Sequence, residues 1–520
     1  MDAHGHTNAM LSLAEELKLL NYCTIFITNT TETPKLYGHE LILIEGQEVA
    51  KFPESICEED AFLGAKLFDH DWDFATQVKF DVDLANDSEW DAASVDSTST
   101  NFKLWSYFWN KSGETDAALE KLLIDIRPDL VVAESLPQRP AVVRLADKSY
   151  AHKVAGWSHG LRWMQLSSFG PLWLYYFADL ASRQQSGGTC DEMPALAPLF
   201  GLPIRRRLGA NDYLTQSERF KGMLISGGIL KSANELHKLA TMENLDADSL
   251  SDSQVGQLLH SESGWLNVFM YPQELDYEQD FENKLDKALW MRVDSLVRPT
   301  SSSSRPLDSD SERLLADLAS WKESNKDDAT AKVVYVSLGT VVSDNFDVMQ
   351  WIMQQVFTCL KTRKQWRFAV SLGKRRAQIC AKFHDELAHW QDTEQRLIAK
   401  GWWPQPDVFH RHLVDGCVIH GGNNTICELF HFSPPPAIVV VPGASDQLDN
   451  ARRLEELDLG VALPLGRFIR NNKDTMLMDA LDRAFELHQK GPEPKSDRPR
   501  RDARYCAQVV SAKLKGEFEC

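Results

Sequence analysis

The chain has 520 residues, of which 43% are hydrophobic, so it is long and apolar enough to bury the cores of two or three domains. Its 75 acidic residues outnumber its 56 basic residues. The resulting net charge of −19 argues against a general binder of nucleic acids or anionic membranes. Nine cysteines, an odd number without a CxxC pair, are typical of reduced thiols in a cytoplasmic protein rather than of a disulfide framework.

The N-terminus lacks the basic segment and apolar core of a signal peptide. No apolar run is long enough to cross a membrane; the nearest candidate, residues 169–181, contains two tyrosines and Asp179. We therefore expect no secretory leader and no transmembrane segment.

Residues 1–297 are predicted to form a first α/β unit. Gly5 and His6 stand ahead of an amphipathic helix, and a buried-type strand at 130–133 leads to Glu134. The polar, acidic stretch 184–263 is predicted to be an insertion, helical in part around 233–242.

Two aromatic-rich stretches of this unit, 105–109 and 157–177, have two interpretations. They could line an apolar pocket for a lipophilic ligand, or they could belong to the core, as such clusters more often do.

A second unit follows the Pro- and Ser-containing linker at 298–314 and spans residues 315–485; a tail with a helix around 505–514 occupies residues 486–520. Short buried-type strands alternate with helical segments in this unit. The predicted strands are 333–338, 368–372, 397–398, 417–419, 437–441 and 461–462. Such alternation predicts a parallel, Rossmann-like sheet.

A tight turn follows the strand at 417–419. It begins at His420, continues through Gly421 and Gly422, and leads into a helix. Glycines allow a ligand to approach the backbone, and the free N–H groups at a helix N-terminus attract anions, so a diphosphate would fit there. Glu428 lies about one turn further along, where its carboxylate could accept hydrogen bonds from the vicinal hydroxyls of a ribose.

Further polar residues are expected near this turn. Asp446 and Gln447 follow the strand at 437–441, and their carboxylate and amide groups suit sugar hydroxyls at the carboxyl end of a strand. Gly339 and Thr340 follow the strand at 333–338 and can bring N–H groups and a hydroxyl to the same edge.

The segment from Trp402 to Asn450 closely resembles the donor-binding signature of family 1 UDP-glycosyltransferases. The resemblance implies a uracil-stacking role for Trp402, ribose contacts for Gln405 and Glu428, and sugar contacts for Asp446 and Gln447. Diphosphate contacts are implied for the residues that form the two turns: Gly339, Thr340, His420, Gly422, Asn423, Asn424 and Thr425. Gly421 and Asn423 stand where plant members have Cys and Trp, as in animal and microbial members.

The resemblance also implies the GT-B fold, in which two Rossmann-like domains face each other across a cleft. The first domain would bind the acceptor, the second would bind the UDP-sugar, and the tail helix would cross back to the first. The donor is a co-substrate and no metal or other cofactor is expected. Gln447 resembles the residue of glucose-using members, so UDP-glucose is the expected donor, ahead of UDP-glucuronate, UDP-xylose and UDP-N-acetylglucosamine. The expected acceptor is a small hydroxylated molecule.

The catalytic pair is implied by the same family. His6 occupies the Gly-His motif and would act as the general base that deprotonates the acceptor for attack with inversion at the anomeric carbon. Glu134 stands where the family usually has the aspartate that orients this histidine. Family members place a buried strand before the motif, and this chain offers only residues 1–5 there, so we expect the first strand to be missing.

Two alternatives to an active transferase stay open. A chain that binds UDP-sugar without a properly built base would be a pseudoenzyme or a partner subunit. A sugar-nucleotide epimerase would share the phosphate turn but not the positions of Trp402, Gln405, Asp446 and Gln447. A zinc site among His410, His412 and His420 is disfavoured, because no cysteine pair or HExxH motif accompanies them.

Overall fold

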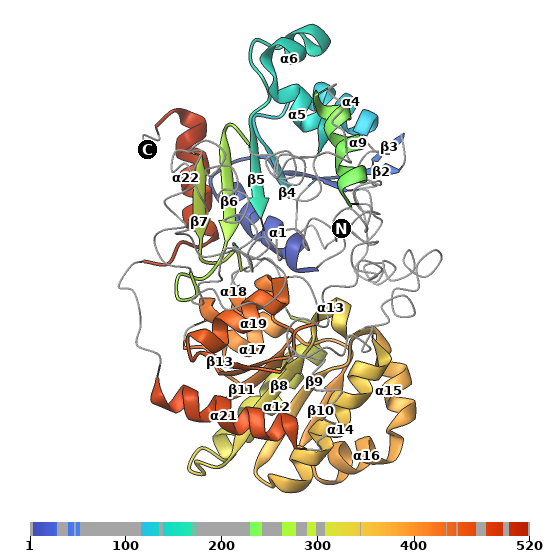
Figure 1. Cartoon of the computed structure of the whole chain (residues 1–520), viewed down its shortest axis with the longest axis vertical. Coiled ribbons are helices and arrows are strands. Elements are labelled where there is room, and N and C mark those ends of the chain that lie inside the picture. Colours follow the sequence, from blue (N-terminus) through green and yellow to red (C-terminus); the bar gives the residue numbers. More distant parts are fainter. Residues whose placement is uncertain are drawn as a thin grey trace, which may run out of the picture.

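The computed structural model describes residues 4–28, 40–45, 48–51, 116–134, 139–167, 171, 229–241, 263–276, 289–297, 307–343, 345–432, 434–443, 446–463, 475–491 and 499–517. Two α/β units are stacked along the long axis of the molecule (Figure 1). The mixed α/β class and the parallel sheets that the sequence predicts are both confirmed.

The described strands of the first unit form two sheets. The smaller sheet has the order β1-β2-β3, and the larger sheet has the order β4-β5-β6-β7 with every neighbouring pair parallel. The strands are β1 (Ile25–Thr28), β2 (Glu40–Glu45), β3 (Glu48–Lys51), β4 (Val131–Glu134), β5 (Trp163–Ser167), β6 (Leu266–Met270) and β7 (Trp290–Val293). Side chains of β5 and β6 are buried along their whole length, as expected for parallel strands covered on both faces.

Helices accompany both sheets of this unit. They are α1 (His4–Leu19), α4 (Asp116–Ile126), α5 (Pro140–Ala146), α6 (Lys148–Ala155) and α9 (Ile229–Thr241). Helix α9 matches the helix predicted inside the 184–263 insertion; the rest of that insertion, apart from Ser263, lies outside the described residues.

The second unit contains one six-stranded parallel sheet with the order β10-β9-β8-β11-β12-β13. The strands are β8 (Lys332–Ser337), β9 (Trp366–Ser371), β10 (Leu397–Lys400), β11 (Gly416–Ile419), β12 (Ala437–Val440) and β13 (Gly460–Ala462). All six strands that the sequence predicts are present, within two residues at each end. The order reverses between β8 and β11, and open α/β sheets bind ligands at such a switch point.

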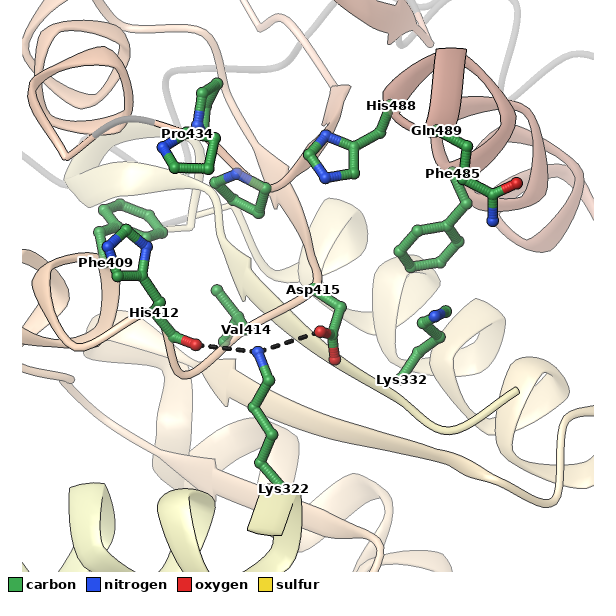
Figure 2. A pocket seen from close by; sticks show the side chains of 12 residues that line it. Lys322, Lys332, Phe409, His412, Val414, Asp415, Pro434, Phe485, His488 and Gln489 are labelled. Atoms are coloured by element: carbon green, nitrogen blue, oxygen red, sulfur yellow. Dashed lines mark hydrogen bonds and ion pairs between the residues drawn. The ribbon is translucent and has the colours of Figure 1, made fainter. Parts of the chain in front are cut away.

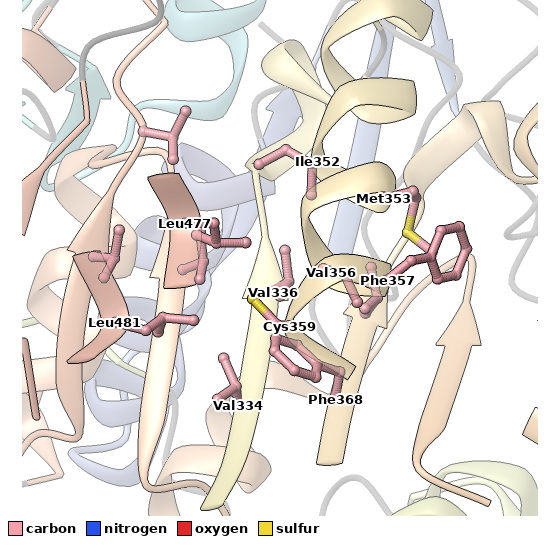
Figure 3. Close-up of a cluster of buried hydrophobic side chains, with 14 of the residues drawn as sticks. Val334, Val336, Ile352, Met353, Val356, Phe357, Cys359, Phe368, Leu477 and Leu481 are labelled. Atoms are coloured by element: carbon pink, nitrogen blue, oxygen red, sulfur yellow. The ribbon is translucent and has the colours of Figure 1, made fainter. Parts of the chain in front are cut away.

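Helices cover both faces of this sheet. They are α12 (Ser309–Ser324), α13 (Gly339–Val342), α14 (Phe346–Thr362), α15 (Arg376–Lys382), α16 (His384–Ala388), α17 (Gln405–His410), α18 (Asn423–His431), α19 (Asp446–Glu456) and α21 (Met476–Lys490). Strand β8 alternates between the faces: Val333 and Tyr335 join one buried cluster, while Val334 and Val336 join the other. Figure 3 shows the second cluster, where Ile352 and Val356 of α14 pack on β8 together with Leu477 of α21.

The tail helix α22 (Ala503–Lys515) packs against α1 and β7 of the first unit (Figure 1). Val510 and Cys506 of α22 are buried in one cluster with Leu13 of α1 and Met270 of β6. The Tyr22 hydroxyl and Ser511 Oγ lie 3.0 Å apart and add a polar contact. The C-terminal end of the described chain therefore contributes to the core of the N-terminal unit.

Candidate functional site

Two predicted turns meet at the switch point of the second sheet. Gly339 follows β8 and His420 follows β11, and these strands are direct neighbours. Gly339 has a φ of +66°, and a Cβ placed on it would lie 2.6 Å from Cε1 and Nε2 of the His420 ring. Only a glycine therefore allows the ring to lie against this turn.

His420 is set up as a neutral hydrogen-bonding group. Burial lowers its pKa from 6.5 to about 4, so the imidazole is uncharged at neutral pH. Its Nδ1 is buried and has no hydrogen-bond partner among the described residues. Because buried polar atoms are rarely left unpaired, this nitrogen is available to a ligand placed over the turn.

The N-terminus of α18 lies next to His420. Gly422 is the N-cap residue and supplies no side-chain cap; the backbone N–H of Ile426 makes the first helical bond, 3.1 Å from the Gly422 oxygen. The preceding N–H groups, at residues 423–425, therefore lack partners within the helix. Together with the helix dipole, they form a site suited to an anionic group such as a diphosphate.

The Asn423 side chain has a different role from the predicted phosphate contact. It is 2% exposed, and its Nδ2 donates to the backbone oxygen of Met270 at 2.7 Å, across the boundary between the two units. Its side chain therefore joins the two units instead of facing the turn. Asn424 and Thr425 follow it, half-buried and buried respectively.

Gln405 and Glu428, the predicted ribose pair, are hydrogen-bonded to each other. Gln405 Nε2 donates to Glu428 Oε2 at 2.6 Å and lies 3.4 Å from Thr425 Oγ1. Burial raises the pKa of Glu428 to about 7, while the hydrogen bond from Gln405 acts in the opposite direction. Residues from α17 and α18 are thus brought together at the carboxyl edge of the sheet.

The other donor residues lie around this pair. Trp402 is 44% exposed, which leaves its ring accessible for stacking. Asp446 and Gln447 were expected at the end of β12, and they occupy instead the first turn of α19; Gln447 Oε1 accepts from the Gly443 N–H at 2.9 Å.

Two residues that the sequence analysis did not single out support the site. The buried Asn450 donates from Nδ2 to the Gly421 oxygen at 2.9 Å and so ties α19 to the phosphate turn. The Tyr335 hydroxyl donates to Gln405 Oε1 at 3.2 Å. Neither has a local signal in the sequence, because Asn450 lies among the polar residues of a helix and Tyr335 among the apolar residues of a strand.

The candidate catalytic residues are described by their backbone only. His6 lies in the first turn of α1, two residues after the helix begins, rather than ahead of the helix. Glu134 is the last residue of β4, paired in register with Leu166 of β5. Their side chains, like that of Thr340, lie outside the described residues, and so does the aromatic stretch 105–109. Trp157 and Trp163 of the second stretch are buried in a core cluster.

A pocket of about 350 Å³ lies at the opposite edge of the second sheet, near the amino ends of β8 and β11 (Figure 2). Lys322 Nζ lies 3.0 Å from Asp415 Oδ1 and donates to the His412 oxygen at 2.8 Å there. None of the predicted donor residues lines this pocket, which is therefore distinct from the candidate donor site.

No group of three or more His, Cys, Asp or Glu side chains in the described ranges is placed to hold a metal ion. Likewise, none of the helices within these ranges is both long and apolar enough to cross a membrane.

Comparisons with known proteins agree on one family. Residues 320–485 match the family described as UDP-glucoronosyl and UDP-glucosyl transferase. An uncharacterized UDP-glucosyltransferase, YdhE, of Bacillus subtilis (strain 168) is 30% identical over 132 residues, 25% of this chain and 29% of that protein. UDP-glucosyltransferase 2 of Dactylopius coccus is 25% identical over 148 residues, 28% of this chain and 25% of that protein. The matched segments thus span less than a third of these relatives.

A solved structure of Os79 from O. sativa in complex with UDP resembles nearly the whole chain. The TM-score is 0.52, and the match covers 97% of each chain at 14% identity. At this identity the likeness concerns the fold, which is the predicted GT-B arrangement of two Rossmann-like units.

Proposed function

We propose that this chain transfers a hexose from a UDP-sugar to a hydroxyl of a small, lipophilic acceptor, because residues 320–485 match the family described as UDP-glucoronosyl and UDP-glucosyl transferase. The observation that carries this proposal is the Gln405–Glu428 hydrogen bond beside the N-terminus of α18. A ribose-binding pair and an anion site at one switch point are what a nucleoside diphosphate requires. Both curated relatives are named as glucosyltransferases, which supports glucose as the sugar.

In the proposed reaction, His6 takes the proton of the acceptor hydroxyl as its oxygen attacks the anomeric carbon. The bond from that carbon to the UDP oxygen breaks on the opposite face, so the configuration inverts and UDP leaves. Glu134 would orient His6. The charge that develops on the diphosphate would be stabilised by the α18 N–H groups and by the neutral His420 ring, without a metal or other cofactor.

The proposed location is the cytoplasm. Six described cysteines are free thiols, and burial raises the pKa of Cys417, Cys427 and Cys506, so these groups stay protonated and unreactive at neutral pH. This state suits a reducing compartment.

The test is incubation of the purified chain with UDP-glucose and a mixture of phenols, sterols and hydroxylated lipids, with hexose addition read by mass spectrometry. A hexosylated product that disappears in His6→Ala supports the transferase and identifies its acceptor class. Binding of UDP without any product would overturn the transfer step and favour a UDP-sugar-binding pseudoenzyme. Absence of UDP binding would overturn both.

A further inference from the structure

We propose that Tyr335 positions the ribose-binding pair: its hydroxyl orients the Gln405 amide, which in turn orients the Glu428 carboxylate toward the donor. This inference rests on the proposed function and adds a residue from the interior of β8 to the donor site. Tyr335 would not touch the donor itself, since its hydroxyl is already committed to Gln405.

The Tyr335 ring is held rigidly. The residue is 1% exposed, and its ring makes edge-on contacts with Phe409 and Trp403, at centroid distances of 5.7 Å and 6.3 Å. Such edge-to-face pairs are favourable and directional. The phenolic oxygen therefore has one fixed position, 3.2 Å from Gln405 Oε1.

The direction of the hydrogen bonds between Tyr335, Gln405 and Glu428 follows from the Glu428 carboxylate, which is the final acceptor. Above its pKa of about 7, Glu428 is an ionised carboxylate that can only accept, so the NH₂ end of the Gln405 amide faces it there, with Nε2 and Oε2 2.6 Å apart. The amide oxygen then faces Tyr335, which must donate. Burial raises the pKa of Tyr335, so its proton is retained at any physiological pH.

The series of hydrogen bonds from Tyr335 through Gln405 to Glu428 leaves one carboxylate oxygen of Glu428 for the donor. Within the described ranges, Glu428 Oε2 accepts from Gln405 and the other oxygen accepts no hydrogen bond. Without the Tyr335 proton, the oxygen end of the Gln405 amide loses its donor, and only Glu428 and, at 3.4 Å, Thr425 Oγ1 hold the NH₂ end. The partner that directs the Glu428 carboxylate would then be less firmly fixed.

The experiment compares binding of UDP and 2′,3′-dideoxy-UDP, which lacks both ribose hydroxyls, to the full chain by titration calorimetry at fixed pH. In Tyr335→Phe the ring and its aromatic contacts remain and one hydrogen bond is lost. We expect UDP affinity to fall about 3- to 10-fold. Affinity for the dideoxy nucleotide should change less than about twofold, because it has no hydroxyl for Glu428 to hold.

Tyr150→Phe is the matched control. The Tyr150 hydroxyl donates to Glu120 Oε1 at 2.6 Å in the first unit, so this change also removes a tyrosine–carboxylate bond but lies outside the donor site. Its UDP affinity should equal that of the unmodified chain. Equal losses for both nucleotides in Tyr335→Phe, or no loss for either, would overturn the inference. Failure of the unmodified chain to bind UDP would instead overturn the proposed function.

Discussion

The two halves of the chain differ in how their candidate residues are distributed along the sequence. In the second half, the residues from Trp402 to Gln447 lie within one continuous segment, and adjacent strands carry them to one edge of one sheet. In the first half, His6 and Glu134 are separated by more than a hundred residues and come from a helix and a strand. A site built from one segment can be inferred from its local pattern, whereas a site built from distant segments depends on the packing of the whole domain.

The largest expected effect separates chemistry from donor binding. In His6→Ala, kcat should fall about 10²- to 10⁴-fold because the acceptor loses its base, while affinity for UDP-glucose stays within about twofold. Steady-state kinetics and calorimetry measure the two quantities. His4→Ala, two residues before His6 at the start of α1, is the control and should retain kcat. An equal loss of kcat in His4→Ala would indicate that the substitutions damage α1 rather than remove a base.

The next effect is a pH dependence within the donor half. With a pKa of about 7 in the free protein, Glu428 becomes protonated as the pH falls and is no longer a charged acceptor for the ribose hydroxyls. Affinity for UDP-glucose should therefore fall roughly 20-fold between pH 7.5 and 5.5. Calorimetric titrations across this range measure it.

Glu428→Gln is the control for this prediction and should give a flat, weak profile. His420 does not interfere, because its pKa of about 4 lies below the window. Stability should change in the opposite sense: the folded pKa is raised above 4.5, so the buried charge destabilises the fold above about pH 7, and this cost is relieved as the pH falls toward 4.5. A pH-independent affinity would contradict the assigned role of Glu428.

A third measurement examines the connection between the halves. Asn423→Ala removes the bond to the Met270 oxygen and leaves a buried acceptor unpaired, so the free energy of unfolding should fall by about 1–3 kcal/mol. Denaturant unfolding measures this change. Affinity for UDP should fall less than about threefold, since the backbone N–H remains.

Asn424→Ala is the neighbouring comparison and should leave the unfolding free energy nearly unchanged. If Asn423→Ala instead weakened UDP binding more than about tenfold with no change in unfolding, the side chain would belong to the donor site after all.

The smallest expected effect concerns the pocket at the amino edge of the second sheet. Lys322→Ala removes a partly exposed ion pair with Asp415, which contributes about 0–1 kcal/mol. UDP affinity should be unchanged, as calorimetry can show. A clear loss of UDP binding in Lys322→Ala would indicate that UDP binds at the amino edge of the sheet, and would contradict the proposed site at the carboxyl edge.

The strands of the second sheet could be predicted because each contains a short run of apolar residues, and in 333–336 and 437–440 these residues are mostly β-branched. The turn at 420–422 was predictable from its glycines. The start of α19 was not, and Asp446 was expected at the end of a strand; an acidic residue in a first helical turn is nevertheless favourable beside the helix dipole.

Other features depend on contacts that leave no trace in a local pattern. The partner of Asn423 is a backbone oxygen 153 residues away, and a carbonyl group has no sequence signature. Tyr335 lies in a run of valines and reads as core, and only the position of Gln405 next to it indicates a polar role. The side-chain arrangement of His6 and Glu134 stays a prediction.

Helix α18 belongs to both halves, and this limits how the chain could be recombined with its relatives. Ile426 and Leu429 pack into the second unit, whereas Cys427 is buried in the cluster that Leu13, Met270 and Cys506 form in the first. Arg500 of the tail bridges the Phe430 oxygen and Glu274.

A chimera with its junction in the linker at 298–314 would pair a foreign α18 with the native first unit. All the contacts that α18 and the tail make with the first unit would then be replaced at once. A working exchange of donor specificity would have to retain Asn423, Cys427 and Arg500 while replacing the ligand-facing residues of the same segment. The exchangeable part of this chain is thus one surface of a helix rather than a domain.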